Sequence, residues 1–298
     1  MSVELPLDQV RTLLAVVDEG TFDAAAAALR VTPSAVSQRV KALEQRTGRV
    51  LLRRTKPVRP TESGEVLVRF ARQLARLERD ARGELGMSGA GAGEPTRVPV
   101  AVNADSLATW FLGALSGLPG VYVELRREDE DHTAALLREG LVMAAVTSSS
   151  QAVPGCSVRA LGRMRYLPVA APEFAADRLA GALPDALAAA PVIVFDRVDD
   201  FQDGFVRRLG GAAASALRHY VPTSEGFVDA VTAGLGWGMV PEAQARPRLR
   251  EGRLVRIGGP EWWVDVPLYW QQWKLDSPAL VAVAEAVIRT AGGALRQP

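Results

Sequence analysis

The segment from Thr21 to Thr61 constrains the fold of this chain more than any other. Its alanine-rich start, 22–29, predicts a short helix with Thr21 as the N-cap, and a tight turn follows at Arg30-Val31. Thr32-Pro33 predicts the start of a second helix, because Thr caps well and Pro loses no hydrogen bond at the first helical position. Prolines then break the basic run 49–61 into a loop around a short strand. Two short helices, a turn and a basic wing are the layout of a DNA-binding helix-turn-helix.

The second of these helices, 33–47, has two different faces. At about 100° per residue, Val36, Val40 and Leu43 form one apolar stripe that must face a core. The opposite side carries short or amide side chains that can reach base edges, and a cation that can bind phosphate. A merely solvated face is the alternative for such a helix in isolation, but the turn, the cap and the basic wing favour DNA contact. The predicted contacts are Thr32, Ser34, Ser37, Gln38, Lys41, Arg53, Arg54 and Arg59.

Charge is distributed unevenly along the 298 residues. The whole chain has a formal net charge of only +1, yet nine Lys/Arg stand between Arg30 and Arg59 with one acid, Glu44. The remainder is therefore net acidic, as expected where a nucleic-acid-binding end is joined to another kind of domain. The length allows two or three domains, each with its own core.

Neither a secretion signal nor a membrane span is expected. The N-terminal segment 1–20 carries acids where a signal peptide needs a basic segment and an unbroken apolar run. Apolar runs elsewhere stay below the roughly 18 residues of a spanning helix. Cys156 is the single cysteine and is expected to be a small buried apolar residue. The sequence therefore predicts a cytoplasmic protein without a membrane partner.

The string AAAALRVTPSAVSQRVKALEQRTGRVLLRRTKPVRPTESGEVLV resembles the N-terminal domain of LysR-type transcriptional regulators. Those proteins share its order of alanine-rich helix, Ser/Pro turn, recognition helix and wing. The resemblance implies a transcriptional regulator that binds double-stranded promoter DNA, with RNA polymerase as a further candidate partner.

A long helix is predicted from Thr61 to Leu85. Its apolar residues recur with the 3-4 spacing of a coiled-coil seam: Leu67, Phe70, Leu74, Leu77 and Ala81. An intramolecular core is the alternative for so short a stripe, but DNA readers of this kind usually occupy two half-sites. The resemblance makes this the dimerising linker helix of a homodimer, which we expect to form a tetramer. Five glycines between Gly83 and Gly93, followed by Pro95, predict a hinge.

From Val98 onward, short apolar strands alternate with helices, which predicts an α/β domain. The expected strands are 98–103, 121–125, 142–147, 167–170, 192–195, 237–241 and 267–270, before a last helix from 277 to 290. The resemblance implies two subdomains around a cleft, similar to type 2 periplasmic binding proteins, with crossings near 163–168 and 264–268. The expected domains are a winged helix-turn-helix at 1–61, a linker helix and hinge at 62–94, and an effector-binding domain at 95–298. Its first subdomain takes 95–165 and 268–298, and its second takes 166–267.

Ligands of such sheets bind beyond the carboxyl ends of strands, near helix N-termini. Polar residues at those places are Asp105, Ser106, Glu128, Thr147, Asp196, Ser224 and Glu225. Each acid, taken singly, is more commonly an ordinary surface charge, and it is their recurrence at strand ends that suggests a site. The neutral stretch 146–153 offers no charge to a ligand.

The resemblance is narrower in this half. The strings VNADSLATWF, EDEDHTAALLREGLVMAAVT, VPTSEGF, GLGWGMVPE and LYWQQWKLDS resemble the ArgP or LysG subgroup, which senses basic amino acids and controls their export. Lysine or arginine is then the expected effector. Hydroxyls of Ser106 and Ser224 would bind its carboxylate, and Thr147 would add a neutral hydrogen bond. The acids Asp105, Glu128 and Asp196 would pair with its cationic groups, Glu128 being the strongest single candidate.

An enzyme is not expected, nor is a cofactor. His132 and His219 lack metal-ligand spacing, the string GLGWG precedes a strand instead of following one, and no GxSxG elbow occurs. Two alternatives stay open. One is a LysR-type regulator of another small-molecule pathway. The other is a solute-binding protein without DNA-binding function, against which the basic N-terminal segment argues.

Overall fold

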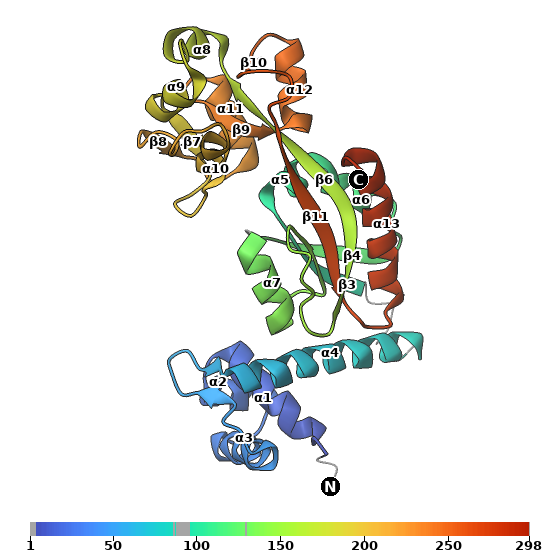
Figure 1. Cartoon of the computed structure of the whole chain (residues 1–298). Helices are drawn as coiled ribbons and strands as arrows, with labels where there is room; N and C mark the ends of the chain where they lie inside the picture. Colours follow the sequence, from blue (N-terminus) through green and yellow to red (C-terminus); the bar gives the residue numbers. More distant parts are fainter. Residues whose placement is uncertain (1–3, 86, 88–95, 129, 298) are drawn as a thin grey trace.

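The computed structural model describes residues 4–85, 87, 96–128 and 130–297. It contains an N-terminal helical unit, a long helix that lies across it, and a two-lobed α/β domain on the other side of that helix (Figure 1). Most of the expected glycine-rich hinge falls outside the described residues. Among the described helices, none combines the length and apolar character that crossing a membrane requires.

The N-terminal unit contains the two short helices and the wing that were expected, together with a helix that precedes them. Its elements are α1 (Leu7–Glu19), α2 (Phe22–Leu29), α3 (Pro33–Thr47), β1 (Leu52–Arg53) and β2 (Arg59–Pro60). Thr21 caps α2, because its side-chain oxygen accepts the N–H of Ala24 at 3.1 Å. Arg30 adopts a left-handed conformation (φ 55°) at the turn into α3, which makes this turn tight.

The long helix α4 (Glu62–Glu84) begins after Thr61, whose hydroxyl oxygen accepts the N–H of Gly64 at 3.1 Å. The predicted seam divides between two environments. Leu67 is buried in the core of the N-terminal unit, together with Val68 and Ala71 of the same helix. Phe70 and Leu77 are 37% and 42% exposed. Neighbouring helices therefore cover only part of α4.

A seven-stranded sheet passes through both lobes in the order β10-β6-β11-β5-β3-β4, with β9 paired to β6. Its strands are β3 (Thr96–Val102), β4 (Val121–Arg127), β5 (Ala144–Thr147), β6 (Cys156–Ala170), β9 (Gly238–Pro241), β10 (Val255–Arg256) and β11 (Val264–Trp273). The first lobe contains β3, β4 and β5. Its helical elements are α5 (Ala104–Ser106), the π turn η1 (Leu107–Phe111), α6 (Leu112–Leu115), α7 (Glu130–Glu139) and α13 (Pro278–Ala294).

The second lobe is built around β9, β10 and the parallel pair β7 (Val192–Val194) and β8 (Arg218–Tyr220). Its helices are α8 (Pro172–Arg178), α9 (Leu183–Ala189), α10 (Phe201–Arg208), α11 (Ser224–Thr232) and α12 (Glu242–Arg250). The α/β class and the two-lobed arrangement are confirmed. Neither β8 nor β10 was expected from the sequence.

The strands β6 and β11 connect the lobes and pair antiparallel, from Tyr166 opposite Val264 to Cys156 opposite Trp273. The expected strands 167–170 and 267–270 were wrong in length, because both crossing strands contain residues that usually end a strand. Gly162 has φ +136° and lies where the register shifts, and Pro267 faces Arg163 in the partner strand. The expected crossings, 163–168 and 264–268, fall within this paired region.

Candidate functional site

The outward face of α3 carries the side chains predicted to read bases. Those on the helix itself are exposed: Ser34, Ser37, Gln38 and Lys41. Val36, Val40 and Leu43 are buried on the opposite face. The side-chain oxygen of Thr32 accepts the N–H of Ala35 at 3.2 Å, so this residue starts the helix, while its hydroxyl hydrogen can still be donated. The cap and the buried stripe together fix which face of α3 points outward.

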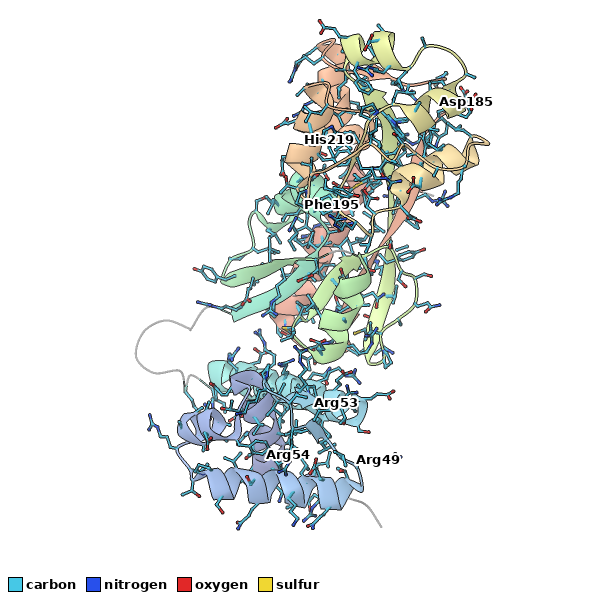
Figure 2. All side chains as sticks on the ribbon, turned by 90° about the vertical axis from the view of Figure 1, so that its left-hand side faces the viewer. Arg49, Arg53, Arg54, Asp185, Phe195 and His219 are labelled. Carbon is cyan, nitrogen blue, oxygen red and sulfur yellow. The ribbon has the colours of Figure 1, made fainter. Side chains whose placement is uncertain are left out.

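A basic wing lies beside this face. Arg53 and Arg59 are register partners in the short pair β1–β2, and both are exposed, as is Arg54. The one acid of the basic segment is part of the scaffold, because Glu44 Oε1 accepts the N–H of Leu51 at 2.8 Å and so ties the wing to α3. Figure 2 shows Arg53 and Arg54 in the N-terminal unit, at the far end of the molecule from the second lobe.

A cavity of about 350 Å³ lies between the two lobes. Its described lining comes from α5, the crossing strands, the β7–α10 loop, α11 and β9, and Phe195 lies between the lobes in Figure 2. The lining includes four aspartates and neither lysine nor arginine: Asn103, Ala104, Asp105, Tyr166, Phe195, Asp196, Val198, Asp199, Asp200, Phe201, Gln202, Ser224, Phe227, Met239, Pro241 and Val266. This is a cavity with negative charge and aromatic walls.

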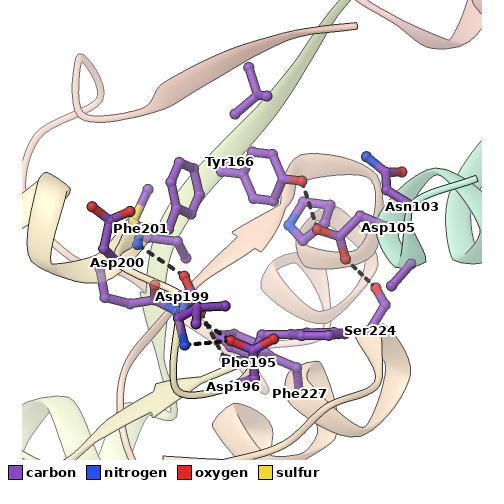
Figure 3. Close-up of a pocket in the computed structure, with 16 residues that line it drawn as sticks. Asn103, Asp105, Tyr166, Phe195, Asp196, Asp199, Asp200, Phe201, Ser224 and Phe227 are labelled. Atoms are coloured by element: carbon purple, nitrogen blue, oxygen red, sulfur yellow. Dashed lines mark hydrogen bonds between the residues drawn. The ribbon is translucent and has the colours of Figure 1, made fainter. Parts of the chain in front are cut away.

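Asp105 joins the two lobes across this cavity (Figure 3). Its carboxylate accepts a hydrogen bond from Ser224 Oγ of the second lobe and one from Tyr166 Oη of β6, each at 2.6 Å. Burial raises the pKa of Asp105, and the two hydroxyl donors oppose that rise by stabilising the carboxylate. A second contact between the lobes is the hydrogen bond from Arg127 Nη1 to the carbonyl oxygen of Pro222, at 2.7 Å. The described cleft is therefore closed by hydrogen bonds.

The other three aspartates follow β7 and differ in how far their oxygens are occupied. Asp199 is fully used within its loop, because its two oxygens accept the N–H groups of Phe195 and Phe201. Asp196 accepts two backbone N–H groups, of Val198 and Asp199, on Oδ1 alone. Asp200 is largely exposed and lies 3.5 Å from Arg207. The second oxygen of Asp196 is therefore the best placed to pair with a bound cation.

Three helix N-termini also meet at the cavity. Ala104 begins α5 in the first lobe, Phe201 begins α10 and Ser224 begins α11, and all three line the cavity. Asn103 caps the first of these, with its side-chain oxygen accepting the N–H of Ser106 at 2.9 Å. Helix N-termini bind anions through free N–H groups and the helix dipole. The cavity thus offers donors to a carboxylate as well as acceptors to a cation.

Three of the seven predicted effector residues line this cavity, namely Asp105, Asp196 and Ser224. The other four lie outside the described lining: Ser106, Glu128, Thr147 and Glu225. Ser106 is buried, and the Oγ of Thr147 accepts the N–H of Ser149 at 3.2 Å. Tyr166, Phe201 and the second and third acids of the β7–α10 loop were not expected from the sequence. The acidic string Asp199-Asp200, five residues after β7, was the signal that could have found the latter.

Comparison with known proteins agrees with this architecture. Residues 7–65 match the model of the bacterial regulatory helix-turn-helix proteins of the lysR family, and residues 92–292 match that of the LysR substrate binding domain. The chain belongs to the LysR family. The family model of the effector domain alone covers more than half of the chain.

Several relatives of this LysR-type regulator are similar over nearly their whole length. The HTH-type transcriptional regulator LysG of Mycobacterium tuberculosis is 49% identical over 289 residues, which cover 97% of this chain and 94% of that protein. The lysine export transcriptional regulatory protein LysG of Corynebacterium glutamicum is 43% identical over 294 residues, covering 97% and 98%. These names agree with the expectation of a regulator and not an enzyme.

Solved structures of two such relatives superpose on the whole chain. The crystal structure of ArgP from Mycobacterium tuberculosis has a TM-score of 0.91 and 48% identity, and covers 99% of this chain and 100% of its own. Full-length LysG from Corynebacterium glutamicum with bound effector Arg has a TM-score of 0.85 and 42% identity, with 98% and 100% covered. The arrangement of helix-turn-helix, long helix and lobes is thus shared with these two solved structures.

Proposed function

We propose that this LysR-type regulator senses arginine or lysine in the cavity between its lobes and controls a gene for basic amino acid export or a related function. The observation that carries the proposal is the charge of the cavity lining, which has four aspartates and no described lysine or arginine. An arginine-bound relative at 42% identity supports the same ligand class.

The lining offers partners to both kinds of charge that a basic amino acid carries. The N–H groups at the starts of α5, α10 and α11 would donate hydrogen bonds to the carboxylate of the ligand. Asp196 would pair with a cationic group through its second oxygen, and the rings of Phe195 and Phe201 offer faces to a guanidinium or ammonium. We keep Asp105, Asp196 and Ser224 as proposed effector residues. Ser106, Glu128, Thr147 and Glu225 stay predictions without support from the cavity lining.

Calorimetric titration of the full chain tests the ligand class. Arginine and lysine should bind. Leucine should bind at least about tenfold more weakly, and so should citrulline, which has the shape of arginine without the side-chain charge; this is the effect of losing one charge-assisted hydrogen bond. Asp196→Asn should weaken arginine binding by a similar factor, and Asp177→Asn, at an exposed aspartate of α8, is the matched control. Equal binding of citrulline and arginine would refute the proposal.

We propose that the base contacts come from Ser34, Ser37 and Gln38 of α3. Lys41, the Thr32 hydroxyl and the wing would bind the phosphates. The arginines of the wing are Arg53, Arg54 and Arg59. A promoter lies in the cytoplasm of a bacterial cell, so we place the regulator there, with RNA polymerase as a partner at the same promoter. A mobility-shift assay tests DNA binding, and the absence of a salt-sensitive, sequence-preferring shift would contradict it.

We also propose that two chains pair through the uncovered side of α4. Val66, Phe70 and Leu77 are exposed there and recur at helical spacing, which is the pattern of a helix that packs on a second helix. A dimer of this kind would place two copies of α3 on two half-sites. A tetramer through the effector domains is the assembly that we expect on longer promoters.

A further inference from the structure

Three arginines of α4 are directed to the effector domain and form what we call the arginine stripe: Arg69, Arg72 and Arg76. Their spacing places them within about 60° of one another around the helix. Each guanidinium donates to a backbone carbonyl oxygen of the first lobe. Arg69 Nη1 reaches Arg138 O at 3.2 Å, Arg72 Nη1 reaches Glu139 O at 2.5 Å and Arg76 Nη1 reaches Arg97 O at 2.5 Å.

The arginine stripe is separate from the two other faces of α4. At about 100° per residue, it lies roughly opposite Leu67 and Ala71, which belong to the core of the N-terminal unit. It is also distinct from the side with the exposed Phe70 and Leu77, which we assign to a second chain. The arginine stripe therefore belongs neither to the core of the N-terminal unit nor to the proposed dimer contact.

The surface that receives the stripe is shaped to fit it. Arg138 and Glu139 are the last residues of α7, where unpaired carbonyl groups carry the negative end of the helix dipole. Gly140 follows with φ +75°, and a Cβ atom there would lie 3.2 Å from Arg69 Cα. The glycine thus ends α7 and also lets α4 approach its end closely. Trp273 Nε1 donates a hydrogen bond to Leu137 O in the last turn of α7, at 3.4 Å.

Arg72 joins this contact to the DNA-binding unit. Its Nη2 pairs with Asp18 Oδ1 of α1 at 2.6 Å, while its Nη1 holds Glu139 O of α7. One guanidinium therefore touches α1, α4 and the first lobe at once. The side chain is 16% exposed, so water screens these bonds less than it would on an open surface.

The other end of α7 follows a strand that contacts the second lobe. The helix follows β4, whose last residue, Arg127, donates to the Pro222 carbonyl oxygen of the second lobe. The N–H of Glu128 then donates to Val102 O at the end of β3, next to Asn103 of the cavity lining. A movement of the second lobe that disturbs Arg127 would therefore reach one end of α7, while Arg69 and Arg72 bind the other end. Figure 1 shows α7 between α4 and the rest of the first lobe.

We propose that the arginine stripe is the contact through which the cleft controls the DNA-binding unit, with Arg72 as the residue that joins the two. The contact is intramolecular: the end of α7 acts on α4 through Arg69 and Arg72, and on α1 through the Arg72–Asp18 pair. The proposal rests on the proposed function only for the identity of the effector, arginine.

The first arm of the test needs no effector. Hydrogen exchange of the full chain compares wild type with Arg72→Ala and with Arg82→Ala, whose exposed side chain pairs with Glu78 within α4. Arg72→Ala should speed the exchange of amides at 137–142, and Arg82→Ala should leave them unchanged. Equal exchange at 137–142 in wild type and Arg72→Ala would overturn the contact itself.

The second arm measures how strongly arginine changes affinity for a DNA site that the protein selects from random duplexes. In wild type this factor should fall within the usual range of allosteric coupling, about 5- to 150-fold. In Arg72→Ala it should drop to within about twofold of unity, while Arg82→Ala keeps the wild-type factor. Asp18→Asn, which leaves the α7 bond of Arg72 in place, should lower the factor without speeding exchange at 137–142.

The outcomes separate the two proposals. A wild-type protein whose DNA affinity does not respond to arginine would contradict the proposed effector. The contact made by the arginine stripe is then tested by the hydrogen exchange at 137–142. A wild-type response that persists undiminished in Arg72→Ala would overturn the coupling role of the arginine stripe. Thermal unfolding of each variant verifies that a lost response does not come from a lost fold.

Discussion

The hydrogen bond between Ser224 and Asp105 makes closure of the cleft measurable. Ser224 begins α11 in the second lobe, and its Oγ lies 2.6 Å from Asp105 Oδ1 in the first. The Ser224→Ala variant removes the donor and leaves the carboxylate with the hydroxyl of Tyr166. Ser224 is 3% exposed, so water has little access to this position to replace the lost bond in the closed cleft.

The size of the effect follows from the charge of the acceptor. A hydrogen bond to a charged group contributes about 1.5–3 kcal/mol net. When the cleft is open, water solvates both groups, so the loss falls on the closed state alone. If arginine binds to the closed state, Ser224→Ala should weaken its affinity by about 10- to 150-fold.

Calorimetric titration of arginine into the full chain measures this loss. The matched control is Ser116→Ala, which removes an exposed hydroxyl that bonds Gly113 O within the first lobe. The double variant with Asp105→Asn decides how Ser224 acts. If Ser224 works through Asp105, the double variant should bind within about twofold of Asp105→Asn alone. Additive losses would refute the bond between the lobes as the cause, and so would a Ser224→Ala protein with wild-type affinity.

Three further predictions concern DNA binding, assembly and stability. Arg59→Ala should reduce the slope of log affinity against log salt by about 1, and an unchanged slope would remove this arginine from the phosphate contacts. Phe70→Glu should shift the protein toward monomers in sedimentation experiments, because it places a charge on the uncovered side of α4, and a wild-type profile would contradict that interface. Hydrogen bonds from Arg165 lower the pKa of Asp265, so this pair stabilises the fold above the usual carboxyl pKa and loses that effect as pH falls through the lowered value. Asp265→Asn should therefore cost about 2 kcal/mol at pH 7, and its deficit against wild type in thermal or urea unfolding should shrink below about pH 4; a constant deficit would refute the linkage.

The sequence was most informative where structure is set by neighbours in the chain. The helix starts at Thr21 and Thr32 depend on a side chain and an N–H three residues later, and both caps form. The crossing strands depend instead on a partner about a hundred residues away, such as Asp265 for Arg165. Each crossing strand passes from one lobe into the other, so its neighbours change along its length. Buried and exposed residues therefore do not simply alternate in these strands.

The position of a strand in the sheet explains why Glu128 lies outside the cavity lining. It stands just beyond the carboxyl end of β4, where the general rule for ligand sites applies. However, β4 forms the edge of the sheet, and the cavity lies where β3, the crossing strands and the second lobe meet. Strand order is a property of the whole fold and cannot be taken from the local pattern. Asp105, which follows the more central β3, does line the cavity.

The occupancy of the aspartates suggests how such a cavity distinguishes a basic amino acid from a neutral one. Asp199 and Asp105 already accept hydrogen bonds on both oxygens, so they shape the site whatever the ligand is. Asp196 retains an oxygen without a hydrogen bond from the described residues. Closing the lobes over leucine would take this carboxylate out of water without a partner, a cost that a guanidinium or ammonium group removes. Selectivity would then come chiefly from a penalty on closure around neutral ligands, so leucine should fail to close the cleft even though its side chain is small enough to enter it.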